Sequence, residues 1–256
     1  MQIDDSHFEL CLAGSEADLH AAQRLRYEVF VAELGGDGPM VDHDARLEAD
    51  RFDAHFDHLL LRDLRRPEGD RVVGVYRVMT EAGAAAAGQF YSEDEYDLSP
   101  LRASGRRLLE LGRSCVHRDY RGGTAMMHLW AGLADYIAAR GIEVMFGVAS
   151  FHGLDPAPLA GPLSLLHHRH LAPAELRPVA RADGFQRMDL VAEAALDRPA
   201  AIRGIPALIK AYLRLGGFVG QGAYVDRAFN CIDVCLVMDV ARIPDRARAL
   251  YQRGAA

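Results

Sequence analysis

The chain contains 256 residues, 50% of them hydrophobic, and carries a formal net charge of −7. This length and composition are enough to bury a sizeable core, and we expect a single α/β domain over residues 1–256. The 29 basic residues are outnumbered by 36 acidic ones, which argues against nucleic-acid binding because affinity for phosphate backbones comes from an excess of Lys and Arg. Any anion-binding site must therefore be local.

The cysteines and the apolar segments bear on the cellular compartment. Four cysteines are spread along the chain: Cys11, Cys115, Cys231 and Cys235. They form no Cys-x-x-Cys pair, so we expect reduced core residues and no metal site. The start carries Asp4 and Asp5 instead of a secretory signal, and no uncharged apolar run reaches the roughly 18 residues of a membrane span. The expected location is the cytoplasm, with peripheral contact at the inner membrane face through the basic amphipathic stretch 208–218 as an alternative.

The hydrophobic pattern predicts strands and one long helix in the first part of the chain. The expected elements are a strand at 8–13, a helix at 16–33, a polar loop at 35–53, strands at 58–63 and 71–79, and a loop of small residues at 82–88.

In the remainder we expect a strand near 108–116, a helix at 125–139, a strand at 142–149, a helix at 163–170, a polar irregular region to about 203, a helix at 206–215, and strands at 218–224 and 232–238. Strands before and after a central βαβ unit predict an α/β fold with a mixed sheet. The core would lie at about 8–150, and the part at about 151–240 would complete the sheet.

A strand followed by a turn and a helix start, residues 108–124, is the most informative segment. The turn Tyr120-Arg121-Gly122-Gly123 precedes Thr124, which is expected to cap the following apolar helix. Unpaired N–H groups at such a helix start bind phosphate, and Arg118 and Arg121 would assist. A Gly pair before a helix is also an ordinary turn.

Arginines are concentrated around this segment: Arg102, Arg106, Arg107, Arg113, Arg118 and Arg121. Such a cluster would suit an acidic partner that carries a phosphorylated arm. The alternative is a solvated Arg-rich surface.

Several blocks together resemble known acyltransferases. The strand, Arg-Gly turn and helix resemble the GNAT superfamily, and RLRYEVF at 24–30, DRFD at 50–53, HLL at 58–60, VVGVYRVM at 72–79 and ELGR at 110–113 look like blocks of acyl-homoserine-lactone synthases. The implied fold is a splayed mixed β-sheet flanked by helices, with a carboxy-terminal extension.

Other blocks resemble the ornithine lipid biosynthesis N-acyltransferases more closely. These blocks are QFYSEDEYDL at 89–98, ELGRSCVHRDYRGG at 110–123, GVASFHGLDP at 147–156, LHHRHLAP at 166–173 and the long segment 208–234. The resemblance implies transfer of a 3-hydroxyacyl chain from acyl carrier protein to the α-amine of L-ornithine, giving lyso-ornithine lipid. It implies no permanently bound cofactor, since the 4'-phosphopantetheine thioester of the carrier protein is a cosubstrate.

The chain departs from the GNAT coenzyme A loop, Arg-x-x-Gly-x-Gly. Counted from Arg121, Thr124 and Met126 stand where those glycines would be. Side chains at these positions keep a pyrophosphate away from the backbone. The departure favours a donor with a single phosphodiester, such as acyl carrier protein.

Amide formation from a thioester requires a neutral amine and a polarised carbonyl. Glu110 is the candidate base, directly or through water, and the alternative is a structural carboxylate paired with Arg113 or Arg77. Backbone N–H groups from Ser114 and Cys115 to Val116 are the candidate oxyanion hole. The acid that protonates the leaving thiolate is not identified. His167, His168 and His170 are the candidates, and the alternative is that they are surface or capping residues.

The resemblance also implies binding residues. The residues expected to contact the substrate are Arg26, Phe30, Asp50, Asp53, Arg77 and Arg113. In lactone synthases the charged residues at the matching positions form an ion network. An arginine would bind the carboxylate of ornithine, and an aspartate or Glu110 would bind its side-chain ammonium group. The pantetheine arm and carrier protein would contact Val116, Arg118, Arg121, Gly122, Gly123 and Thr124.

Two other functions stay open on the sequence. A lactone synthase would use S-adenosylmethionine, but residues 31–49 lack the Trp that those synthases usually carry there. A non-catalytic GNAT-like module that binds acyl carrier protein or lipid would show binding without turnover.

Overall fold

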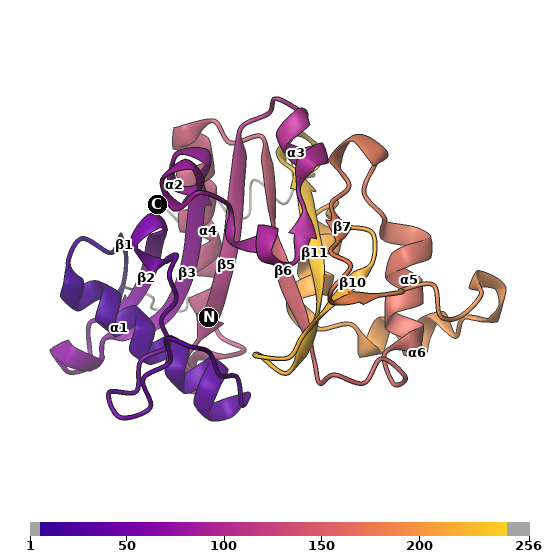
Figure 1. Ribbon diagram of the computed structural model, residues 1–256. Helices are drawn as coiled ribbons and strands as arrows, with labels where there is room; N and C mark the ends of the chain where they lie inside the picture. The colour runs from indigo at the N-terminus through magenta and orange to yellow at the C-terminus, as the bar shows by residue number, and fades with distance from the viewer. Residues whose placement is uncertain (1–5, 245–256) are drawn as a thin grey trace. The chain divides into compact units, whose positions relative to one another are not determined.

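The computed structural model describes residues 6–244 and divides into two compact units. Within these residues, unit 1 comprises 6–87 and 111–141, and unit 2 comprises 88–110 and 142–244. Strand β5 (Leu108–Val116) changes unit between Glu110 and Leu111. Figure 1 labels the elements of both units.

Unit 1 is a sheet with helices packed on it. Its strands follow the order β1-β2-β3-β5, with antiparallel pairing from β1 to β2 and from β2 to β3. Besides β5, its strands and helices are β1 (Phe8–Leu12), α1 (Glu16–Arg26), β2 (Asp57–Asp63), β3 (Val72–Thr80), α2 (Glu81–Ala87) and α4 (Ala125–Arg140). Short 3₁₀ turns lie at Asp53–His55, Glu68–Asp70 and Arg118–Tyr120.

Helices α1 and α4 cover opposite faces of the unit 1 strands. Leu60 and Val75 pack with Leu25 of α1 in one buried cluster. The adjacent Gly74 faces Leu129 of α4, and a Cβ at this glycine would lie 2.9 Å from the leucine side chain. Because successive residues of a strand point to opposite faces, the central strands β2 and β3 are buried on both sides, whereas β1 has no fully buried residue.

The predicted helix over 16–33 changes geometry near its middle. It begins at Ser15, whose Oγ accepts a hydrogen bond from Asp18 N at 3.2 Å, and it is α-helical to Arg26. A π-helix then covers Tyr27–Glu33. The wider turns rotate the side chains that follow, a change of period that a hydrophobic pattern does not reveal.

Unit 2 has its own sheet, in the order β5-β6-β11-β10-β8, with β9 also paired to β11. Strands β4 and β7 form a separate pair. Besides β5, its strands and helices are β4 (Tyr96–Asp97), α3 (Ser99–Ala103), β6 (Val144–His152), α5 (Ala160–His170), β7 (Val179–Ala180), β8 (Phe185–Gln186), α6 (Arg198–Gly204), α7 (Ala207–Arg214), β9 (Phe218–Val219), β10 (Ala223–Asp226) and β11 (Cys231–Asp239). Short 3₁₀ turns lie at Tyr91–Asp94, Ala174–Leu176, Glu193–Ala195 and Val240–Arg242.

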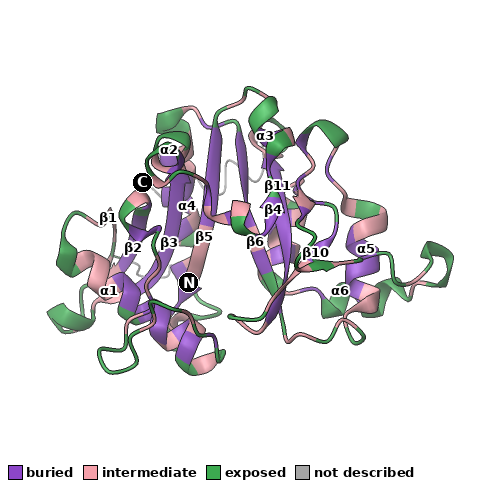
Figure 2. Ribbon diagram, in the orientation of Figure 1, coloured by how far each residue is buried: buried purple, intermediate pink, exposed green. Residues whose placement is uncertain are grey.

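The pairing within unit 2 is mixed. Strands β5 and β6 run parallel over the pairs from Leu108↔Val144 to Glu110↔Phe146, and β11 pairs antiparallel with β6 from Cys231↔His152 to Asp239↔Val144. Figure 2 shows that buried residues concentrate in the strands, and in β11 all but Asp239 are buried. The mixed α/β class with a carboxy-terminal helical and strand extension is thereby confirmed.

Three sequence predictions about local structure are wrong. Residues 82–88 were expected to form a loop, but all except Gly88 belong to helix α2, because alanine has the highest helix propensity. The region expected to be irregular contains α6, which begins at Asp197 with a side-chain cap on Ala200 N at 3.0 Å. The strand expected at 218–224 is divided between β9 and β10, and Gly222 between them has φ +77°.

The four cysteines were expected to be reduced core residues. All four cysteines are free, and all but Cys11 are buried. Within residues 6–244, none of the helices combines the length and apolar content that crossing a membrane requires.

Gly83 in α2 provides a test of this packing. A Cβ there would lie 2.5 Å from the backbone oxygen of His55, so Gly83→Ala should lower the free energy of unfolding by about 1–3 kcal/mol through overpacking, although Ala favours a helix. Urea denaturation followed by circular dichroism measures the change. The exposed Ala85→Gly is the control and should cost about 1 kcal/mol through propensity alone; a stabilised Gly83→Ala would contradict the packing.

Candidate active site

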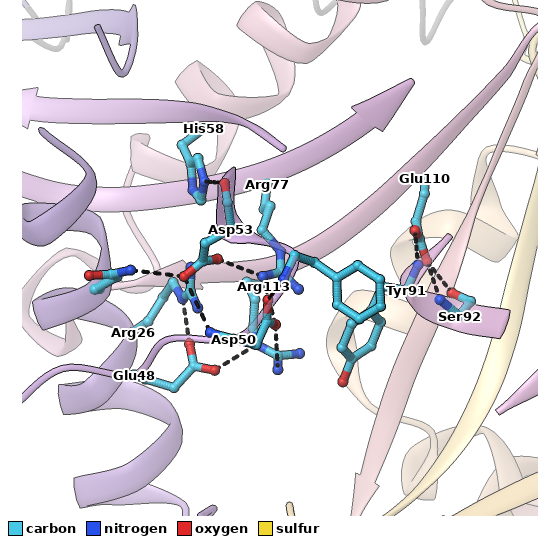
Figure 3. Close-up of polar contacts among 12 residues, drawn as sticks. Arg26, Glu48, Asp50, Asp53, His58, Arg77, Tyr91, Ser92, Glu110 and Arg113 are labelled. Atoms are coloured by element: carbon cyan, nitrogen blue, oxygen red, sulfur yellow. Dashed lines mark hydrogen bonds and ion pairs between the residues drawn. The ribbon is translucent and has the colours of Figure 1, made fainter. Parts of the chain in front are cut away.

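Buried charges in unit 1 form one connected ion network (Figure 3). Arg26 comes from the end of α1, Arg77 from β3 and Arg113 from β5. The three carboxylates all come from the segment between α1 and β2. The members are Arg26, Glu48, Asp50, Asp53, Arg77 and Arg113.

Asp53 is the centre of the network. Its Oδ1 accepts hydrogen bonds from Arg26 Nη1 at 2.6 Å and from Arg77 Nη1 at 2.7 Å. Its Oδ2 accepts one from Gln23 Nε2 at 2.9 Å, and its backbone oxygen lies 3.0 Å from His58 Nε2. Through these contacts of Asp53, the short 3₁₀ helix at 53–55 connects α1 to β2 and β3.

Glu48 and Asp50 complete the connections. Glu48 binds Arg26 Nε through Oε2 and accepts from Arg113 Nε at 3.1 Å through Oε1. Asp50 Oδ2 lies 2.7 Å from Arg77 Nη1 and 3.5 Å from Arg113 Nη2. The resemblance predicted five of the six members. Glu48 was missed because it lies in a polar loop with no apolar period, and an acidic residue two positions before Asp50 was its one sequence signal.

The charges of the network balance, and this sets the protonation of its members. Burial opposes ionisation of Glu48, but the guanidinium groups of Arg113 and Arg26 outweigh it and lower its pKa to about 2. Burial opposes ionisation of Asp53 as well, and Arg26 and Arg77 hold its pKa well below the ordinary range. Burial lowers the pKa of His58, against the hydrogen bond to the Asp53 backbone. We therefore expect an ionised network around a neutral His58 at pH 7.

Arg113 lies on a distorted part of β5. Its φ is +47°, in the left-handed region that non-glycine residues seldom adopt, and Gly112 precedes it. Its guanidinium carbon lies 6.0 Å from the centre of the Phe30 ring, so Phe30 lies beside the network. The ion pairs with Glu48 and Asp50 hold this strained backbone, and such strain is common at functional sites.

Glu110 in unit 2 has a different environment (Figure 3). Its Oε1 accepts from Ser92 N at 2.6 Å and Ser92 Oγ at 2.5 Å, and its Oε2 accepts from Tyr91 N at 2.8 Å. These three donors use most of the about four lone-pair sites of a carboxylate. Glu110 thus anchors the 3₁₀ turn Tyr91–Asp94, while the expected alternative partners Arg77 and Arg113 take their carboxylates from residues 48–53.

Ser114, Cys115 and Val116 lie on β5 after the distortion. The Cys115 side chain belongs to the buried cluster with Leu25 and Val75, and burial raises the pKa of its thiol to about 12. A thiol in this setting is no nucleophile. Any contribution of Cys115 to the reaction therefore comes from its backbone N–H.

The turn that follows β5 in unit 1 keeps two exposed arginines. Arg121 Nη1 lies 2.8 Å from Glu33, and Arg118 Nε lies 3.5 Å from the same carboxylate. Gly122 has φ +78°, which requires glycine. Thr124 stands at the helix start, but its side chain makes no capping hydrogen bond, so that prediction is wrong.

The predicted arginine cluster is divided between the two units, and several of its members have carboxylate partners. Arg102 pairs with Glu93 and Arg106 with Asp239 in unit 2, and Arg113 belongs to the ion network. Asp239 lies 133 positions from Arg106 in the chain, so adjacency in sequence does not reveal this pair. Arg118 and Arg121 remain as the arginines next to the proposed phosphate-binding turn.

Other polar groups in unit 2 have local explanations. Atoms of Asp226, Cys231 and Asp233 lie within 4.8 Å of one another, but Asp226 Oδ1 also accepts from Ala228 N at 2.8 Å and Phe229 N at 3.1 Å. That pattern is typical of a turn-capping aspartate. In the predicted histidine run, His168 Nε2 lies 3.0 Å from the backbone oxygen of Val191.

Comparison with known proteins identifies the family. Residues 25–131 match the model of an acetyltransferase (GNAT) domain. The chain is 60% identical over 248 residues to an L-ornithine N(alpha)-acyltransferase of Rhodobacter capsulatus, covering 96% of this chain and 95% of that protein. The chain belongs to the L-ornithine N(alpha)-acyltransferase family. The L-ornithine N(alpha)-acyltransferase of Brucella abortus is 42% identical, over 95% of this chain and 88% of that protein.

Solved structures extend the comparison to the fold. The CoA-dependent acyl-homoserine lactone synthase BjaI matches with a TM-score of 0.53 at 16% identity, over 96% of this chain and 89% of that chain. FeeM, an N-acyl amino acid synthase from uncultured soil microbes, matches with a TM-score of 0.51 at 12% identity, over 91% and 90%. The member of the L-ornithine N(alpha)-acyltransferase family described here is thus an acyltransferase with the GNAT fold, as the resemblance predicted.

The ion network predicts a specific response to acid. Glu48 contributes stability above its ordinary pKa of 4.5, and this contribution is lost as pH falls toward about 2. Glu48→Gln should lower the free energy of unfolding at pH 7 by about 3–5 kcal/mol, because Arg26 and Arg113 lose a charge partner in the interior. The remaining stability should also depend less on pH in that window.

Urea denaturation at a series of pH values measures both effects. Glu28→Gln is the matched control, since Glu28 pairs with Arg46 at 2.7 Å on the surface, where an ion pair contributes about 0–1 kcal/mol. Equal losses in the two variants would contradict a buried, stabilising network.

Proposed function

We propose that this protein transfers a 3-hydroxyacyl chain from acyl carrier protein to the α-amine of L-ornithine and releases lyso-ornithine lipid. The observation that carries the proposal is the 60% identity, over nearly the full length of both chains, to a protein named for ornithine Nα-acylation. Sequence blocks that resemble this family extend through both units, at 89–98, 110–123, 147–156, 166–173 and 208–234, and include Glu110 and Arg113.

The proposed reaction is a direct acyl transfer. Glu110 removes a proton from the α-ammonium group, directly or through water, and the neutral nitrogen attacks the thioester carbonyl. Backbone N–H groups between Ser114 and Val116 polarise the carbonyl oxygen. The new C–N bond forms, the C–S bond breaks, and the thiolate leaves and takes up a proton. Because a thiol has a pKa near 8.5, this last step needs little acid assistance.

The ion network is the proposed source of contacts to the charged groups of ornithine. Its members differ in exposure: the side chains of Asp50 and Arg113 are 18% and 11% exposed, whereas those of Arg26 and Arg77 are fully buried. We assign the substrate carboxylate to Arg113 and the side-chain ammonium to Asp50, since these groups can be reached from outside the network. The buried members, with Phe30, hold them in position.

The donor is proposed to bind at the turn between β5 and α4. Arg118, Arg121 and the N–H groups of Gly122, Gly123 and Thr124 would hold one phosphodiester. Thr124 and Met126 replace the glycines of the coenzyme A loop, which favours the carrier-protein donor. No resident cofactor enters this reaction.

Purified protein tests the proposal directly. It should acylate ornithine with 3-hydroxyacyl carrier protein as donor, more slowly with the matching acyl-CoA, and not with acetyl-CoA. Lysine, glycine and glutamine are tested as acceptors in place of ornithine. Mass spectrometry of lipids from a bacterial host lacking aminolipids should reveal a new lyso-ornithine lipid. A lactone formed from S-adenosylmethionine, or carrier-protein binding without any turnover, would overturn the assignment.

The role of Glu110 can be separated from its structural contacts. Glu110→Gln should reduce kcat by about 10²–10⁴-fold, the usual contribution of a general base, and remove the acid limb of the kcat profile. Ser92→Ala is the control because it removes one hydrogen bond to the same carboxylate, at 2.5 Å, and leaves the carboxylate present. If both variants lose stability and activity to the same extent, Glu110 is structural and not the base.

A further inference from the structure

A buried carboxylate at the end of β2 has no function in the reaction described above. Asp63 is 1% exposed. Its Oδ1 accepts from Arg65 N and Nε, each at 3.0 Å, and its Oδ2 accepts from Arg65 Nη2 at 2.8 Å and from the Tyr120 hydroxyl at 2.7 Å. Hydrogen bonds from Arg65 and Tyr120 outweigh burial and keep the pKa of Asp63 low. Tyr120 therefore donates to an ionised, buried acceptor.

The ring of Tyr120 is fixed on several sides. Phe8 of β1 and His117 make edge-on contacts with ring centres 6.0 and 5.9 Å away. The guanidinium carbon of Arg66 lies 5.9 Å from the ring centre. Tyr120 is thus enclosed by β1, by the β2–β3 connection and by its own turn, all within unit 1.

Tyr120 is the residue directly before the proposed donor-binding turn, 121–124. The preceding part is tied to the sheet by His117 N donating to Val73 O at 2.9 Å. Arg121 Nε donates back to Val116 O at 3.0 Å, and Arg121 also pairs with Glu33. The hydrogen bond from the Tyr120 hydroxyl to Asp63 connects this turn to the end of β2.

We propose that Asp63 and Tyr120 are positioning residues that hold the turn 121–124 in the geometry that binds the donor phosphate. The inference rests on the proposed function, which places that phosphate at the turn. Backbone N–H groups bind an anion well only when they converge on one point. A hydrogen bond to a buried carboxylate is directional and stronger than one between neutral groups, so it suits this purpose.

Tyr136 provides a comparison in the same unit. Its hydroxyl also donates to an aspartate, Asp57 Oδ2, at 2.6 Å, but the Asp57 side chain is 49% exposed whereas that of Asp63 is 2% exposed. Tyr136 lies in the last part of α4, remote in sequence from the turn at the start of that helix. Tyr136→Phe removes a tyrosine–aspartate hydrogen bond without touching the donor turn.

The experiment compares Tyr120→Phe with Tyr136→Phe in the full-length protein. Tyr120→Phe should raise the KM for 3-hydroxyacyl carrier protein, and the Kd for holo-acyl carrier protein in calorimetry, by about five- to tenfold, because only part of the energy of the lost hydrogen bond to a charged group is transmitted to the donor site. The KM for ornithine and kcat should stay within about twofold. Tyr136→Phe should leave all four values unchanged.

Hydrogen exchange supplies a readout independent of the reaction. Amides of residues 118–124 should exchange faster in Tyr120→Phe and at the wild-type rate in Tyr136→Phe. Unchanged exchange and unchanged donor affinity would overturn the inference, and so would parallel losses in kcat and ornithine affinity. If wild-type protein neither binds nor uses carrier-protein donors, the proposed function fails, whereas the exchange rates still decide whether Asp63 orders the turn.

Discussion

The compensation of charge inside unit 1 is the constraint on which the rest of that unit depends. Removing a charged side chain from water costs several kcal/mol, and the cost is recovered only when oppositely charged groups and hydrogen bonds surround it. Arg26 and Arg77 are fully buried, so the segment 48–53 must supply its carboxylates in one arrangement. The polar segment is consequently fixed between a helix and two strands, although it contains little regular structure of its own.

In the proposed function, the same network serves both stability and substrate recognition. The network is electrically balanced without a substrate, but its two most accessible members, Asp50 and Arg113, belong to opposite charge types. A zwitterionic amino acid offers the same pair of charges and can compete for them without leaving a net charge behind. Glu110 likewise combines a structural contact with a proposed chemical role. Its carboxylate accepts hydrogen bonds from the backbone of Tyr91 and Ser92, and it is the group proposed to accept a proton from the substrate.

The sequence predicted the positions of the long strands along the chain well, because strands that are covered on both faces consist of continuous apolar runs. It failed where local preference and context disagreed: the alanine-rich α2 looked like a loop of small residues, and the passage from α to π geometry at Tyr27 leaves no trace in hydrophobic spacing. The resemblance predicted Arg26, Asp50, Asp53, Arg77 and Arg113 as one network. It did not predict Glu48 or the Arg106–Asp239 pair, because ion pairs between distant segments depend on the tertiary fold.

The division of β5 between the units has a consequence for synthesis on the ribosome. Neither unit is a continuous stretch of chain: unit 1 is interrupted by residues 88–110, and unit 2 by 111–141. The sheet of unit 2 also needs β11, Cys231–Asp239, to pair with β6. An emerging chain thus exposes β6 without its main partner until residues 231–239 have also been synthesised. Such a strand edge attracts other chains, so chaperone demand should be greatest while residues 153–230 emerge.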